Sequence, residues 1–146
     1  MAAIGPNDTR KTVESMASKI LKMKLWPDDV EGQWKRNVRE IHGEVLCVSQ
    51  FTLYASTRKG NKPDFHGAAK PEIAKDLYEH FFSTIKQSYD PDRVKDGVFQ
   101  AMMQVSLVND GPVTLQMDTE DPKKSTGTNT PDTSSRTIDS PTRPTD

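Results

Sequence analysis

The sequence predicts an α+β domain in which two amphipathic helices pack on a strongly curved sheet, followed by a disordered tail. Two stretches place apolar residues at helical spacing, and four or five others alternate as strands do. From residue 119 to 146 the only aliphatic residue is Ile138, so this stretch cannot bury enough apolar surface to fold. We therefore assign residues 1–118 to one domain and residues 119–146 to the tail.

The two helices are predicted from their apolar stripes. Asp8 suits the N-cap of the first helix, and Pro71 suits the first turn of the second because its φ is already helical. The stripe positions are Val13, Met16, Ala17, Ile20 and Leu21 in the first helix, and Ile73, Ala74, Leu77, Phe81 and Ile85 in the second, which Tyr78 and Phe82 broaden.

The strands are predicted from alternation. They cover residues 22–26, 44–54, 98–108 and 113–117, with a short strand fragment near 37–41 in an otherwise polar loop. The second of these is apolar on both faces up to Ser49, which is typical of a central strand covered on both sides. Its polar end, Ser49, Gln50 and Thr52, is therefore expected where a buried strand emerges.

Charge and cysteine content exclude several classes of protein. The net charge of −1 argues against a long basic face for nucleic acid, so any RNA contact should be short, such as a single-stranded end. One cysteine, Cys47, cannot form an intramolecular disulfide and fits a core position in a reducing compartment. The chain has no signal peptide and no long apolar span, which predicts no membrane contact and a cytoplasmic location.

A basic loop follows the polar strand end. Residues 55–70 carry Arg58, Lys59, Lys62, His66 and Lys70, with Asp64 as the only acid. Such a cluster is either a solvated loop or, beside a polar strand end, a place that holds phosphates.

The sequence contains no arrangement typical of nucleophilic or metal catalysis. His42, His66 and His80 fall in a turn, a loop and a helix, and none has a spacing that predicts a base beside a hydroxyl. No His, Cys or Asp cluster has metal-ligand spacing. The hydroxyl groups of Ser49, Thr52 and Thr114 are therefore expected to bind and position a substrate rather than attack it.

Two motifs carry the functional signal. One is SQFTLY, residues 49–54, and the other is NDGPVT, residues 109–114, where Gly111 and Pro112 interrupt two alternating runs. Together they resemble the D-aminoacyl-tRNA deacylase family, whose signatures are a Ser-Gln-Phe-Thr strand end and an Asn-x-Gly-Pro-x-Thr turn. The likeness extends from residue 4 to residue 118.

The resemblance implies a fold and an activity. The family has a barrel-like, mostly antiparallel sheet in a homodimer, and it hydrolyses the ester that joins a D-amino acid to the 3′ end of tRNA, without metal or cofactor. The family's two N-terminal strands, and an arginine that braces the Gly-Pro turn, have no counterpart in this sequence. The expectation is thus an N-terminally incomplete domain. A rival interpretation is a non-catalytic protein that binds nucleic acid or protein, for example DNA at replication.

The resemblance also implies the roles of individual residues. A Gly-Pro bond that is cis and enters the partner subunit's site would reject L-amino acids, with backbone N–H groups binding the oxyanion. Either a threonine or a water assisted by the tRNA ribose would attack. The implied residues are Ser49, Gln50, Phe51, Thr52 and Thr114 for catalysis, Gly111 and Pro112 for chiral selectivity, and Phe99, Met103 and Asn109 for substrate binding, where Phe99 and Met103 would hold the terminal adenine.

Overall fold

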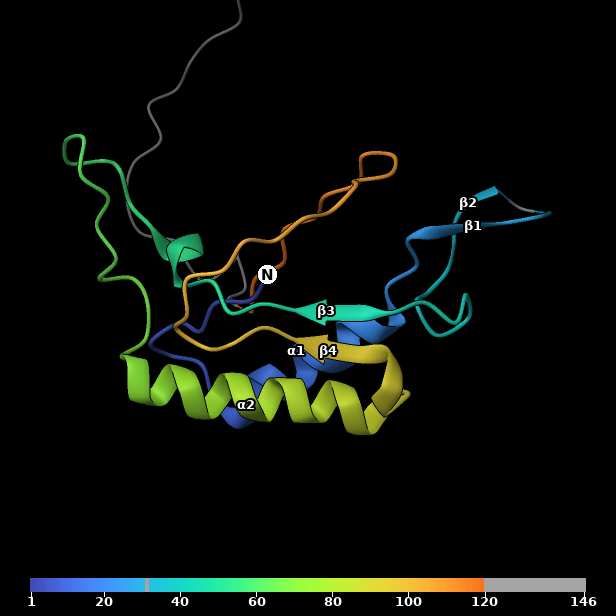
Figure 1. Ribbon diagram of the computed structural model, residues 1–146, viewed down its shortest axis with the longest axis horizontal. Helices are drawn as coiled ribbons and strands as arrows, with labels where there is room; N and C mark the ends of the chain where they lie inside the picture. The colour runs from blue at the N-terminus through green and yellow to red at the C-terminus, as the bar shows by residue number, and fades with distance from the viewer. Residues whose placement is uncertain (31, 120–146) are drawn as a thin grey trace, which may run out of the picture.

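The computed structural model describes residues 1–30 and 32–119 (Figure 1). Within them the chain forms two long helices and two small sheets, so the mixed α and β composition is confirmed. The tail predicted to be disordered lies, from residue 120 onward, outside the described residues. The elements are α1 (Arg10–Lys22), β1 (Trp26–Asp28), β2 (Gly32–Arg36), β3 (Val45–Cys47), the 3-10 turn η1 (Phe51–Tyr54), α2 (Pro71–Ser88), the 3-10 turn η2 (Pro91–Arg93) and β4 (Val94–Asp96).

Helix α1 begins one residue later than the sequence predicted. Thr9 is the N-cap, and its hydroxyl accepts from the Thr12 N–H while the Thr12 hydroxyl accepts from the Thr9 N–H, a reciprocal capping box. Asp8 is not the cap. Its carboxylate instead accepts the Gly5 N–H at 2.8 Å and so folds the preceding turn.

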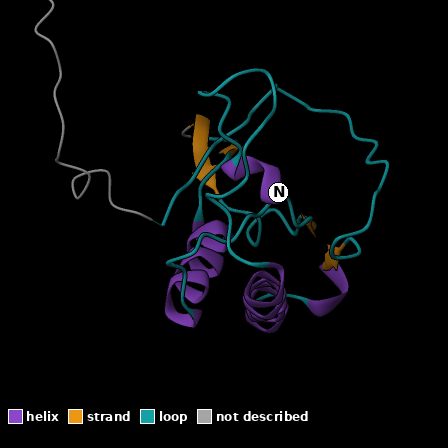
Figure 2. Cartoon of the chain, turned by 90° about the vertical axis from the view of Figure 1, so that its left-hand side faces the viewer, coloured by secondary structure: helices purple, strands orange, loops and turns teal. Residues whose placement is uncertain are grey.

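The core lies between the two helices and the β3–β4 pair. Figure 2 shows both long helices on one side of the molecule and most of the loops on the other. Ile85 is fully buried, as its stripe predicted, whereas Ile73 is 53% exposed and does not belong to the inner face of α2. The buried cluster consists of Ile4, Val13, Ala17, Leu21, Val38, Cys47, Leu77, Tyr78, Phe81, Ile85 and Val94.

The described residues contain two separate two-stranded sheets and no closed barrel. Strands β1 and β2 pair antiparallel, but β3 and β4 pair parallel, so the mostly antiparallel barrel is not found. The first strand was also predicted about four residues too early, since Pro27 lies inside β1 rather than ending it. The fragment predicted near residues 37–41 is a turn, because the Gly43 N–H bonds back to the Val38 carbonyl at 2.9 Å.

The strand predicted over residues 44–54 breaks into three parts. Its first part, β3, pairs with β4 and ends at Cys47. The chain then forms a bridge to the N-terminal segment at Ser49, and its last part is the 3-10 turn η1. Leu46 is 58% exposed, so β3 is covered on one face only. The segment from residue 44 to residue 54 therefore has different neighbours along its length. Each paired stretch is short because the neighbour changes.

The strands predicted over residues 98–108 and 113–117 do not form. Gln100 has a φ of 61°, and the Ala101 N–H bonds to the Val98 carbonyl, so a turn replaces the start of the first strand. Beyond it the segment finds no strand partner among the described residues. It runs past β3 to a tip and back, shown in orange in Figure 1. Its apolar side chains Leu107 and Val108 are exposed.

Candidate functional site

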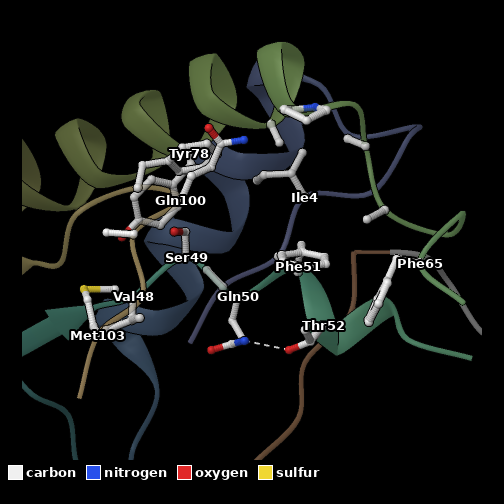
Figure 3. A pocket seen from close by; sticks show the side chains of 18 of the residues that line it. Ile4, Val48, Ser49, Gln50, Phe51, Thr52, Phe65, Tyr78, Gln100 and Met103 are labelled. Carbon is white, nitrogen blue, oxygen red and sulfur yellow. Dashed lines mark hydrogen bonds between the residues drawn. The ribbon is translucent and has the colours of Figure 1, made fainter. Parts of the chain in front are cut away.

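The polar stretch that follows β3 opens into a hollow of about 1030 Å³ (Figure 3). Its walls come from the N-terminal segment, the stretch after β3, the start of α2 and the segment after β4. Six of the predicted site residues line it: Ser49, Gln50, Phe51, Thr52, Phe99 and Met103. Two stretches that are far apart in the sequence, residues 49–52 and the segment with Phe99 and Met103, therefore meet at one place.

Backbone pairing with the N-terminal segment fixes the strand end. The Ala2 N–H donates to the Val48 carbonyl, and the Ala2 carbonyl accepts the Gln50 N–H, both at 2.8 Å. In the described part of the chain the N–H groups of Phe51 and Thr52, at the start of η1, donate to no protein acceptor. Two backbone donors without a protein acceptor, on residues that line the hollow, are available to bind an anion.

The hydroxyl groups of the hollow have no base beside them. The Gln50 amide donates from Nε2 to Thr52 Oγ1 at 2.6 Å, which orients the threonine without accepting its proton. Elsewhere His66 pairs with Asp64, and His80 pairs with Glu14. Among the described residues that line the hollow, tyrosine is the only titratable type. The described lining therefore supplies no carboxylate or imidazole that could act as a general base.

Phe99 and Met103 reach the hollow because the segment after β4 folds back on itself. The Met103 sulfur accepts the Val98 N–H at 3.4 Å and lies against Gly97, where an added Cβ would stand 2.8 Å from Sδ. Phe99 packs on Tyr78 with ring centroids 5.8 Å apart. One wall of the hollow is thus flat and apolar, a surface suited to stacking a nucleobase.

Tyr78 lines the hollow, although the sequence predicted it only as a core residue. It is 3% exposed, and its hydroxyl has no hydrogen-bond partner in the described part of the chain. Burial, with smaller contributions from Cys47 and Asp96, raises the pKa of the phenol well above its usual value. It therefore stays protonated and is no general base at neutral pH.

Several other lining residues were not singled out as site residues from the sequence, and three of them come from three different segments. Ile4 comes from the N-terminal segment, Gln100 from the turn after β4, and Phe65 from the basic loop. Phe65 packs edge-on against Phe51, with ring centroids 5.0 Å apart. An aromatic residue within a polar, basic loop was the available signal for Phe65.

The Gly-Pro turn does not reach this hollow within the same chain. Gly111 and Pro112 are exposed, and the bond between them is cis. The segment that carries them, drawn in orange in Figure 1, runs out to a tip. Gly111 has a φ of 124°, and Asn109 Oδ1 accepts the Val113 N–H at 3.4 Å, which closes the turn. Thr114 lines a second hollow of about 540 Å³, so the predicted site residues are divided among the first hollow, the exposed Gly-Pro turn and this second hollow.

The described residues lack two other kinds of feature. Within 1–30 and 32–119, no group of three or more His, Cys, Asp and Glu side chains is placed to hold a metal ion. No helix in these ranges has the length and apolar character needed to cross a bilayer.

Known proteins resemble the chain over most of its length. The profile of the family described as D-Tyr-tRNA(Tyr) deacylase matches residues 1–118. The D-aminoacyl-tRNA deacylase of Yarrowia lipolytica is 54% identical over 125 residues, which cover 84% of this chain and 81% of that protein. The solved structure named "c-Myc DNA Unwinding Element Binding Protein" is 44% identical, with a TM-score of 0.71 over 77% of this chain and 74% of that one.

A second solved structure supports the fold alone. It is described as "Structural Analysis of a probable eukaryotic D-amino acid tRNA deacylase", and it matches with a TM-score of 0.54 at 15% identity, over 69% of this chain and 72% of that one. The family profile spans both motifs and every element of the described fold. This chain therefore belongs to the D-Tyr-tRNA(Tyr) deacylase family.

Proposed function

We propose that the chain hydrolyses the ester of D-aminoacyl-tRNA in the cytoplasm, releasing the D-amino acid and free tRNA. The observation that carries this proposal is the hollow at the strand end. It combines two unpaired backbone N–H groups, at Phe51 and Thr52, with a flat apolar wall made by Phe99 and Met103. The names of the relatives support the same reaction.

The geometry supports a reaction by water. In this scheme the terminal adenine lies against Phe99 and Met103, which brings the ester to the strand end. Water adds to the carbonyl carbon, and the N–H groups of Phe51 and Thr52 stabilise the oxyanion. The bond to the 3′ oxygen then breaks, and that oxygen takes the proton that the water has lost. The ribose 2′-OH assists the water, since the lining supplies no carboxylate or imidazole.

Selection for the D enantiomer requires a contact at Cα. The side chain is the same in both enantiomers, and one methylene is worth only ~1–3 kcal/mol, so a side-chain pocket cannot separate them. We place the Gly111–Pro112 backbone of a second subunit over the hollow, in a homodimer, where it leaves no room for an L side chain. The exposed tip that carries both residues is available for this contact.

Parallel incubation with a D-aminoacyl-tRNA and its L counterpart tests the proposal. Deacylation of the D ester alone supports it. No hydrolysis of either ester by protein whose helices are intact by circular dichroism would contradict it. Hydrolysis of both esters at equal rates would support the esterase activity but contradict the selectivity for the D enantiomer.

A second candidate is DNA binding, which the name of the 44% identical structure favours. It predicts that duplex DNA binds at physiological salt while D-aminoacyl-tRNA is left intact. Fluorescence anisotropy with labelled duplex DNA, run beside the deacylation assay, separates the two candidates.

A further inference from the structure

The basic loop lies between two stretches that both line the hollow. Residues 49–52 precede it, and Phe65, Ala68 and Ala69 follow it on the way to Pro71. The loop therefore leaves the rim of the hollow and returns to it. In Figure 1 it forms the green extension beyond η1.

Two sets of contacts anchor the loop at the rim. Ser56 and Asp64 exchange both backbone hydrogen bonds, at 2.8 and 2.9 Å, which closes residues 57–63 into a hairpin. Just beyond this closure Phe65 packs on Phe51, and the Ala69 N–H donates to the Ile4 carbonyl at 2.9 Å. The base of the hairpin is thus fixed to the walls of the hollow, while its tip is exposed.

The hairpin carries positive charge that the described residues do not neutralise. Arg58, Lys59 and Lys62 are exposed, and none of them has an ion pair in the described part of the chain. The nearest acid in sequence, Asp64, bonds instead to the His66 backbone and ring, and these bonds hold the pKa of its carboxyl below the usual value. Lys70 adds a fourth exposed cation between Ala69 and Pro71, two residues of the rim.

We propose that residues 57–63 form a phosphate clamp that holds the backbone of a single-stranded RNA end while its last nucleotide occupies the hollow. This inference rests on the proposed function and extends it to the nucleotides before the terminal adenosine. A chain of net charge −1 has no broad basic face, so an exposed hairpin that carries three cations without an ion pair among the described residues, and whose base is fixed to the wall of the hollow, favours the approach of a polyanion there. The clamp contacts phosphates and not bases, so it should bind every tRNA that has the same single-stranded 3′ end.

Salt dependence tests the clamp with a short single-stranded RNA that ends in CCA. For single strands the slope of log K against log salt is about −0.7 per phosphate neutralised, so three cations give about −2.1. Wild-type affinity, from fluorescence anisotropy, should fall at least ~18-fold between about 50 and 200 mM salt. In the triple variant Arg58→Gln, Lys59→Gln, Lys62→Gln the slope should become shallower by about 2.

A matched variant removes three exposed lysines that line neither hollow: Lys22→Gln, Lys24→Gln and Lys95→Gln. Its slope should equal that of the wild-type protein. Equal slopes for the hairpin variant and the wild-type protein, or no RNA binding at low salt, would overturn the clamp.

A substrate without phosphates separates this proposal from the deacylase itself. On D-aminoacyl-tRNA the hairpin variant should lose ~10-fold or more in kcat/KM at low salt, whereas on 3′-D-aminoacyl-adenosine the loss should disappear. An equal loss on both substrates would show a structural defect and overturn the clamp. If neither substrate is cleaved by wild-type protein while the RNA slopes still differ, the deacylase proposal fails and the clamp stands.

Discussion

The two halves of the predicted site behave differently in the same chain. Residues 49–52 sit on the core, tied to the N-terminal segment by hydrogen bonds at 2.8 Å, and they meet Phe99 and Met103 around one hollow. Residues 109–114 stand on an exposed segment without a strand neighbour in the described part of the chain. One half is thus organised by the fold of its own subunit, whereas Gly111 and Pro112 in the other half are exposed and line neither hollow of this subunit.

The largest expected effect is on the half of the site formed by residues 49–52, which lies on the core. Mutations that open a cavity in the core should destabilise it. Ile85→Ala should lower the free energy of unfolding by about 2–5 kcal/mol, because it leaves a cavity under fully buried packing. The matched control is Ile73→Ala on the same helix, where the side chain is 53% exposed and the change should stay within about 0.5 kcal/mol. Urea denaturation measures both, and similar losses would show that α2 packs in another orientation.

The next effect concerns the tip. Gly111 has a φ of 124°, and an added Cβ would stand 2.9 Å from Val113 Cγ2 and 3.0 Å from Val113 N. Gly111→Ala should therefore shift the tip, lower the single-turnover rate on the D ester by ~100-fold and reduce the D to L ratio. Gly32→Ala is the control, since Gly32 also has a positive φ but no atom near its added Cβ. Its D to L ratio should match the wild type.

Alkaline pH should lower the free energy of unfolding of the core that supports residues 49–52. Burial raises the pKa of the Cys47 thiol to about 11, against 9.0 for the free group. The folded state therefore holds this proton longer than the unfolded state. Stability that is complete below pH 9 should fall by about 2–3 kcal/mol as pH rises through 11. The decline should be smaller in Cys47→Ala, and an identical decline in both proteins would mean that the thiol is not buried.

A weaker effect should follow from changing the threonine in the hollow. Thr52→Ala removes the acceptor of the Gln50 amide and should lower the single-turnover rate by ~10-fold, with the preference for D retained. Thr114→Ala, in the second hollow, should cost less. Loss of a true nucleophile costs on the order of 10⁶-fold, so abolished turnover in Thr52→Ala would restore the threonine mechanism.

Local apolar patterns predicted the two helices, and the resemblance to the deacylase family implied six of the residues that line the hollow. The apolar stripes of α1 and α2 depend only on residues that are close in the sequence. The motif residues 49–52 reach the hollow because they follow a strand that ends at the core. The strand limits failed where pairing is not local. Nothing in residues 44–54 shows that the partner changes after Cys47, and nothing in residues 98–108 shows that Gln100 turns the chain. Tyr78 was missed because a residue in an apolar helix stripe has no signature of its own, and the signal for Phe65, an aromatic residue in a basic loop, does not show which surface it packs against.

Complementation between two damaged subunits tests most directly whether the tip acts in the partner's hollow. Ser49→Phe fills the hollow, and Gly111→Ala shifts the tip, so each variant alone should be nearly inactive on D-aminoacyl-tRNA. If the tip acts in the partner's hollow, a mixed dimer has one site with both intact parts. Co-expression should then restore about a quarter of the wild-type activity, since half of randomly formed dimers are mixed and each has one intact site of two. Activity no higher than the sum of the two variants would contradict this arrangement, because hollow and tip would then act within one chain or not together at all.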